Sequence, residues 1–178
     1  MGIANHRTWW MMARRIVARR MVARLVVLSV VATLVVGALP ASGLSADPIG
    51  HRLLASQKRT PAGVTGQLGR LASTRNAYHE MWEHFRLRGE RPRVNWQRKK
   101  VLLVTTGESS ICPLRFEKLG VHHENKTFRV KAPSSGDVCT DDWTPRTFVI
   151  AVARGSIPEG KLNARVNSYR RVWVRRVR

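Results

Sequence analysis

The sequence predicts a mainly β domain of the α+β class, a compact antiparallel sheet or sandwich of about five to seven strands with one amphipathic helix packed in front of it. Beyond Pro92, apolar and polar residues alternate with a period of two in short stretches that Gly, Pro and Ser separate. Before Pro92, one stretch has the three-and-four spacing of an amphipathic helix. The 178 residues are 43% hydrophobic and 24% charged, which is the composition of a globular protein.

Residues 1–46 have the three parts of a secretory signal peptide. Six arginines and no acid precede residue 25, the run Leu25–Leu39 is apolar, and small residues follow up to Ala46. As a helix, the run covers about 22 Å of a hydrocarbon core of about 30 Å, which favours cleavage near Gly43 or Ala46. No charge occurs in residues 25–46, however, so a retained membrane anchor is the alternative. Either outcome places the rest of the chain outside the cytoplasm, secreted or membrane-anchored.

Residues 47–67 are expected to form a basic linker. Proline and glycine recur through this segment together with Lys58 and Arg59, and such spacing interrupts regular structure. The folded domain is therefore expected to span residues 68–178.

The helix is expected within residues 68–87. Ser73 or Thr74 can cap its best-ordered part, and Gly89 with Pro92 ends it. Its apolar face consists of Leu68, Leu71, Tyr78, Met81, Trp82 and Phe85. An aromatic stripe at this spacing is typical of core packing, so we expect the helix to lie against the sheet.

The strands are expected after Pro92. Residues 101–104 are a continuous apolar run, which predicts a strand buried on both faces. Residues 114–123 and 126–132 flank Glu124-Asn125 and predict a hairpin. Further strands are expected at residues 146–152, 162–166 and 171–176.

The chain has two cysteines, Cys112 and Cys139, which excludes a disulfide-rich miniprotein and a four-cysteine zinc ribbon. An exported chain enters an oxidising compartment, so we expect a disulfide. Closing this loop would stabilise the fold by roughly 3.5 kcal/mol in the chain-entropy model. A metal pair or a reactive thiol would need partner residues that the neighbouring sequence does not offer.

The sequence predicts no metal, no cofactor and no catalytic residue. His79 and His84 are five residues apart, hence about 140° apart around a helix, whereas the zinc-protease motif requires a spacing of four. The segment from Gly107 to Ile111 lacks the second glycine of a nucleophile elbow.

Four motifs carry a resemblance to a known family. They are Tyr78–Trp82 (YHEMW), Pro92–Trp96 (PRVNW), Gly107–Pro113 (GESSICP) and Cys139–Val149 (CTDDWTPRTFV). With them, the block from Tyr78 to Ile150 resembles a family of small secreted proteins of Gram-positive bacteria that is largely uncharacterised. The order of helix, proline-led strand and small sheet is similar, more distantly, to the C-terminal domain of a bacterial protease-stabilising protein. The resemblance implies the fold and the disulfide but no activity, and the chain departs from the family at Asn95, where an acidic residue is common.

A disulfide would also bring two loops together. Bonded cysteines have Cα atoms about 5 to 6 Å apart, which places Glu108 near Asp142 and Arg146. We therefore expect an ion pair of Arg146 with Glu108 or with Asp142 that braces the loops, and solvent-exposed charges without a defined partner are the alternative.

The charge predicts acidic partners. The net charge is +21, and the chain after Ala46 keeps 26 basic and 11 acidic residues. The expected cationic surface comprises Arg98, Lys99, Lys100, Arg170, Arg171, Arg175, Arg176 and Arg178. It would attract an acidic envelope polymer, an anionic membrane surface or another protein, and no small-molecule substrate is inferred.

Three classes of function are open. A non-enzymatic extracytoplasmic binding or stabilising module is favoured, because no acid, base and nucleophile converge. Extracellular nucleic-acid binding is the first alternative, since arginines surround Trp173. An envelope-polymer hydrolase is the second, with paired carboxylates drawn from Glu108, Asp141 and Asp142, although the adjacent Asp141 and Asp142 diverge on an extended chain.

Overall fold

The computed structural model describes residues 47–178, and this part of the chain is mainly β, as the sequence predicts. Its elements are β1 (Asp47–Pro48), β2 (His51–Gln57), β3 (Leu68–Ala72), α2 (Arg75–His84), β4 (Lys99–Glu108), β5 (Lys118–His122), β6 (Thr127–Lys131), β7 (Thr144–Ala153), the 3-10 turn η1 (Arg154–Ser156), β8 (Leu162–Val166) and β9 (Val172–Val177). The predicted signal peptide or anchor lies outside the described residues. Within residues 47–178, none of the helices has the length and apolar character needed to cross a membrane.

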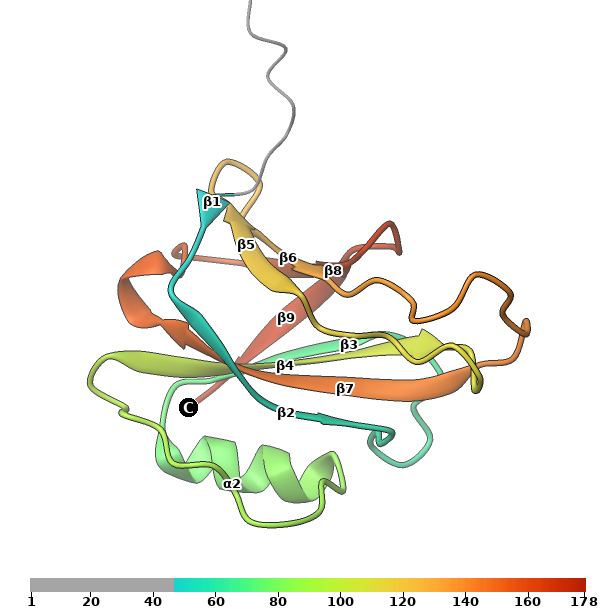
Figure 1. The fold of residues 1–178 in the computed structure, drawn as a ribbon. Coiled ribbons are helices and arrows are strands. Elements are labelled where there is room, and N and C mark those ends of the chain that lie inside the picture. Colours follow the sequence, from blue (N-terminus) through green and yellow to red (C-terminus); the bar gives the residue numbers. More distant parts are fainter. Residues whose placement is uncertain (1–46) are drawn as a thin grey trace, which may run out of the picture. The chain divides into compact units, whose positions relative to one another are not determined.

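The strands form one curled sheet, in the order β1-β5-β6-β8-β9-β3-β4-β7-β2 (Figure 1). Its two edge strands, β1 and β2, are separated in the chain only by Ile49 and Gly50. The same segment therefore pairs with β5 at one edge and with β7 at the other, which makes the sheet nearly closed and barrel-like. His51 helps at this junction, because its Nε2 accepts a hydrogen bond from the Leu119 backbone N–H of β5 at 3.4 Å.

The sheet is mixed, and this corrects the expectation of an antiparallel sheet. β3 pairs with β9 in parallel, and β6 pairs with β8 in parallel. The other strand pairs are antiparallel, including the predicted β5–β6 hairpin. Alternation of apolar and polar residues predicts where a strand lies. It does not predict whether that strand pairs in parallel or antiparallel with a strand distant in sequence, so these two parallel pairs could not be predicted from the pattern.

The linker expected at residues 47–67 is also corrected. β1 and β2 belong to the sheet, and β2 pairs with β7 over most of its length. The prolines and glycines that suggested a linker lie outside β2, at Pro48 and Gly50 before it and from Pro61 to Gly66 after it. The helix is shorter than expected for a similar reason: Leu68 and Leu71 belong to β3, and the helix begins only after Thr74.

Two apolar cores lie on opposite faces of β4, so this strand is buried on both faces as predicted. Leu102 and Val104 face the interior of the curled sheet, where they join Phe128, Phe148 and Ile150. The outer core contains Val101, Leu103, Val149 and the apolar face of α2, namely Ala77, Tyr78, Met81, Trp82 and Phe85. The predicted cap is present, since Thr74 Oγ1 accepts a hydrogen bond from the Ala77 N–H at 3.2 Å. The helix therefore covers the outside of the sheet (Figure 1).

Replacing Gly69 by alanine is expected to destabilise the protein by about 1–3 kcal/mol. Gly69 is buried where β3 meets β9, and a Cβ there would lie 2.8 Å from Val174 Cγ2 and 3.2 Å from the Trp173 carbonyl oxygen. Gly66→Ala is the matched control, because nothing lies within 4 Å of the added Cβ, and it is expected to leave stability unchanged or slightly raised. The free energies of unfolding of both variants in urea check this; equal midpoints would contradict it.

Candidate functional site

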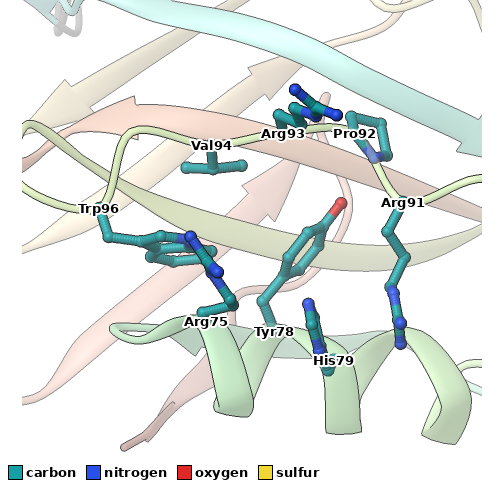
Figure 2. Close-up of a pocket in the computed structure, with 8 residues that line it drawn as sticks. All are labelled: Arg75, Tyr78, His79, Arg91, Pro92, Arg93, Val94 and Trp96. Atoms are coloured by element: carbon teal, nitrogen blue, oxygen red, sulfur yellow. The ribbon is translucent and has the colours of Figure 1, made fainter.

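A cleft lies between α2 and the segment that leads into β4. It has a volume of about 520 Å³ and is lined by Arg75, Tyr78, His79, Arg91, Pro92, Arg93, Val94 and Trp96. In Figure 2 the helix forms its floor, residues 91–94 form its far rim, and the Trp96 ring closes one side. We refer to it as the arginine cleft.

The floor of the cleft follows from the helix sequence. Arg75, Tyr78 and His79 stand at helical positions i, i+3 and i+4, which share one face of a helix. The Tyr78 ring packs edge-on against Trp82 at 5.8 Å and tilted against Trp96 at 5.7 Å between ring centres. These contacts fix the ring, so its hydroxyl points toward the 91–94 rim (Figure 2).

Hydrogen bonds hold the rim although the segment is neither helix nor strand. Gln57 exchanges two 2.9 Å hydrogen bonds with the Arg88 backbone, and Arg52 donates to the Arg93 carbonyl at 3.3 Å. The Asn95 side-chain oxygen accepts from the Gln97 and Arg98 N–H groups, and this forms a turn before β4. Side chains of the edge strand β2 therefore hold the segment that crosses α2 at Arg88 and Arg93.

The cleft is cationic. Its lining contains three arginines and one histidine but no carboxylate among the described residues. Glu83 pairs with Arg91 at 3.3 Å, but the Glu83 side chain is 77% exposed, so this surface pair neutralises little of the cleft.

The Tyr78 hydroxyl is buried without a hydrogen-bond partner, and the whole residue is only 2% exposed. Leaving such a group unsatisfied costs about 1–3 kcal/mol. Burial raises the pKa of Tyr78 to about 12, with the nearby Arg91 acting in the opposite direction. The phenol therefore stays protonated and keeps an unused hydrogen-bond donor beside the cleft.

This arrangement suits an anion. Guanidinium groups donate charge-assisted hydrogen bonds to carboxylate or phosphate oxygens, and the Tyr78 hydroxyl supplies a neutral donor from the floor. Three arginines are poor ligands for a metal cation, and within residues 47–178 no group of three or more His, Cys, Asp or Glu is placed to hold one.

The predicted disulfide between Cys112 and Cys139 is present, with the Cα atoms 5.6 Å apart. It joins the loop after β4 to the loop before β7. Disulfides persist in oxidising environments, so the bond points to a site outside the cytoplasm.

Of the two ion pairs open from the sequence, the structure forms the one between Arg146 and Glu108. Arg146 donates to both Glu108 oxygens, with Nη2–Oε1 at 2.6 Å and Nε–Oε2 at 2.8 Å. The Leu114 backbone N–H also donates to Oε2, and the Glu108 side chain is fully buried. This pair therefore ties β4 to β7 and to the disulfide-linked loop.

Asp142 does not pair with Arg146 but joins the loop after β4 to the loop before β7 through hydrogen bonds. Its carboxylate accepts from the Thr140 hydroxyl and from the Ser110 backbone N–H, the latter at 3.1 Å to each oxygen. These bonds, the Thr140 hydroxyl first and the Ser110 N–H second, hold the pKa of Asp142 well below its usual range. Asp141 is exposed, so the three carboxylates considered for a hydrolase have different surroundings.

The predicted cationic residues divide among several places. Lys100 lies close to Arg176 and Arg178, and also to Arg154, which the sequence reasoning did not include. Arg170 and Arg171 line a second cavity, beside Trp143. Arg175 opposes Arg70 on neighbouring strands. Arg98 and Lys99 lie in the turn and strand start that follow Trp96.

Sequence reasoning assigned Tyr78 to the core and did not single out the cleft arginines. A signal was present in the spacing of Arg75, Tyr78 and His79 on one helix face, followed by Arg91 and Arg93 around Pro92. What the sequence does not show is that residues 91–96 fold back over that face. Comparison of the chain with protein-family models, curated proteins and solved structures found no match.

Glu108→Gln is expected to destabilise the protein by about 3 kcal/mol, because it leaves the largely buried Arg146 guanidinium without a counter-charge. The matched control is Glu117→Gln, which breaks the surface pair of Glu117 with Lys131 and should cost less than about 1 kcal/mol. Urea unfolding of the two variants measures the difference. A loss as small for Glu108→Gln as for the control would contradict a structural role for the buried pair.

The 109–110 loop is expected to loosen at acid pH. The pKa of Asp142 is lower in the folded than in the unfolded chain, so its contribution to stability is fully present above about pH 4 and is lost as pH falls through the lowered folded value. Hydrogen exchange of the Ser110 amide, corrected for its intrinsic rate, should stay slow at pH 4 and accelerate below it. Asp142→Asn should abolish this acid dependence, whereas titration of Asp142 in an NMR experiment at an ordinary value would refute it.

Proposed function

We propose that this protein is a non-enzymatic extracytoplasmic binding module, secreted or membrane-anchored, whose arginine cleft takes an acidic group of an anionic envelope polymer. The single observation that carries the proposal is the buried, unpartnered Tyr78 hydroxyl at the floor of a cleft that three arginines line. A carboxylate or phosphate in the cleft would satisfy the hydroxyl and the guanidinium groups together.

The location rests on two observations. The N-terminal residues have the pattern of an export signal, and the Cys112–Cys139 bond suits an oxidising compartment. Outside the membrane of a Gram-positive cell, for which the family resemblance argues, abundant acidic polymers would meet a domain of this charge.

The absence of catalysis is supported by how the candidate carboxylates are used. Glu108 is fully buried, with its oxygens bonded to Arg146 and to the Leu114 N–H. Asp142 accepts hydrogen bonds that hold two loops together. A pair of carboxylates that serves a glycosidase must instead flank the bond to be cleaved.

The test is binding of poly(glycerol phosphate) to the exported full chain at one fixed salt concentration, measured by isothermal titration calorimetry. Arg93→Gln is expected to weaken binding about 10- to 100-fold, since it removes a charge-assisted contact while the Arg93 carbonyl keeps its bond from Arg52. Tyr78→Phe is expected to weaken binding about 3- to 10-fold with stability unchanged or raised, because the lost hydroxyl has no partner in the free protein.

Arg115→Gln is the matched control, because Arg115 is an exposed arginine outside the cleft and its loss changes the net charge equally. If Arg93→Gln and Arg115→Gln bind the polymer alike, attraction depends on net charge alone and the cleft is not the site. Tighter binding to anionic vesicles than to the polymer, with the same loss in Arg93→Gln, would replace the polymer by a lipid headgroup as the partner.

A further inference from the structure

A second concave surface lies at Gly107, near the C-terminal end of β4, whereas the rim of the arginine cleft belongs to the segment before the N-terminal end of β4. It has a volume of about 510 Å³, and its lining includes Gly107, Trp143, Tyr169, Arg170 and Arg171. Trp143 and Tyr169 are 45% and 47% exposed, so both rings offer a free face to a ligand. We call this surface the Trp143 groove.

The Trp143 ring is held in place by the residue beneath it. A Cβ on Gly107 would overlap the indole, so the ring lies directly over the glycine backbone. The surroundings of Gly107 are rigid because it pairs with Pro145 in the β4–β7 ladder. Trp143 is therefore an exposed aromatic ring that packs on one side against the backbone of β4.

The groove continues onto the outward face of β9. Val172 and Val174 pack toward the interior core, so Trp173 and Arg175, which alternate with them, point outward. Arg171 precedes Trp173 by two residues and also lines the groove. Trp173 is 68% exposed, and an arginine thus stands on either side of it along the chain.

Neighbouring strands extend this cationic surface. Arg70 of β3 is paired in register with Arg175, and Arg165 of β8 lies two residues from Asn163, which is opposite Trp173. Burial first, and the nearby Arg175 guanidinium second, lower the pKa of Arg70, as expected for like charges held close together. The strands β3, β8 and β9 contain no acidic residue.

We propose that the Trp143 groove and the outward face of β9 bind single-stranded nucleic acid, with bases stacked on Trp143, Tyr169 and Trp173 and phosphates on Arg170, Arg171 and Arg175. Alternation of exposed aromatic rings with guanidinium groups is the pattern that such a ligand requires, since every nucleotide offers one flat ring and one phosphate. A neutral glycan would use the rings and leave the arginines without counter-charges. A polyphosphate would use the arginines and leave the rings unused. The two features together therefore favour the nucleic acid.

The test is fluorescence anisotropy of a labelled 12-nucleotide oligo(dT) with the exported full chain. Trp173→Ala and Trp143→Ala are each expected to weaken binding about 5- to 150-fold, the cost of losing one stacked base. Ile111→Ala is the matched control, because Ile111 is a comparably exposed apolar residue outside the groove. Trp173 is largely exposed, so its replacement is not expected to unfold the protein, and urea unfolding verifies this.

Two competitors separate the ligand classes. Inorganic polyphosphate should displace oligo(dT) less well than unlabelled oligo(dT) does, and a neutral oligosaccharide should not displace it. The proposal is overturned if both tryptophan variants bind oligo(dT) as the wild type does, if polyphosphate competes equally, or if the oligosaccharide competes.

The two binding proposals fail independently. Trp173→Ala should leave the affinity for poly(glycerol phosphate) unchanged, and Arg93→Gln should leave the affinity for oligo(dT) lowered no further than Arg115→Gln does. If Arg93→Gln alone abolishes oligo(dT) binding, the nucleic acid occupies the arginine cleft and the groove proposal is wrong.

Discussion

Burial of β4 on both faces is the constraint on which the rest of the structure depends. Leu102 and Val104 require a dry interior on one side, and Val101 and Leu103 require a cover on the other. The curled sheet supplies the interior and α2 supplies the cover. Covering the outer face requires the wide aromatic face of the helix, which draws Tyr78 almost completely out of water. The unpartnered hydroxyl at the floor of the arginine cleft is thus a direct consequence of how β4 is covered.

Because the middle of β4 is buried, its charged residues lie at its two ends, and the charges around them differ between the ends. Near its C-terminal end, Glu108 is matched by Arg146 and fully satisfied. Near its N-terminal end, Lys100 lies among Arg176, Arg154 and Arg178, and burial followed by these like charges lowers its pKa. Like charges that are held close in the free protein repel one another, and a bound anion relieves that repulsion. The imbalance would therefore add to affinity for the acidic partners proposed above without specifying one of them.

The sequence pattern predicted the features that depend on neighbouring residues. It failed to predict the features that depend on contacts between residues distant in the sequence. The strand Leu162–Val166, residues 101–104 of β4, a cap at Ser73 or Thr74 and the disulfide were predictable, because alternation, apolar runs, capping residues and cysteine pairing can be recognised in the sequence. β2 was not, because its place in the sheet depends on an edge of β7 that lies 90 to 101 residues further along the chain. The cleft was missed for the same reason: only its helical half is encoded locally, whereas the segment that folds back over the helix receives hydrogen bonds from Gln57 and Arg52 of β2 at Arg88 and Arg93.

The two proposed binding surfaces are linked mechanically by β4. Trp96 of the arginine cleft lies three residues before Lys99, and Gly107 of the Trp143 groove lies eight residues after it. At about 3.3 Å per residue, an extended strand separates Lys99 from Gly107 by about 26 Å. Because β4 is paired on both sides and buried, that spacing is rigid. The arginine cleft and the Trp143 groove would therefore be occupied separately, each ligand binding with the affinity of its own site.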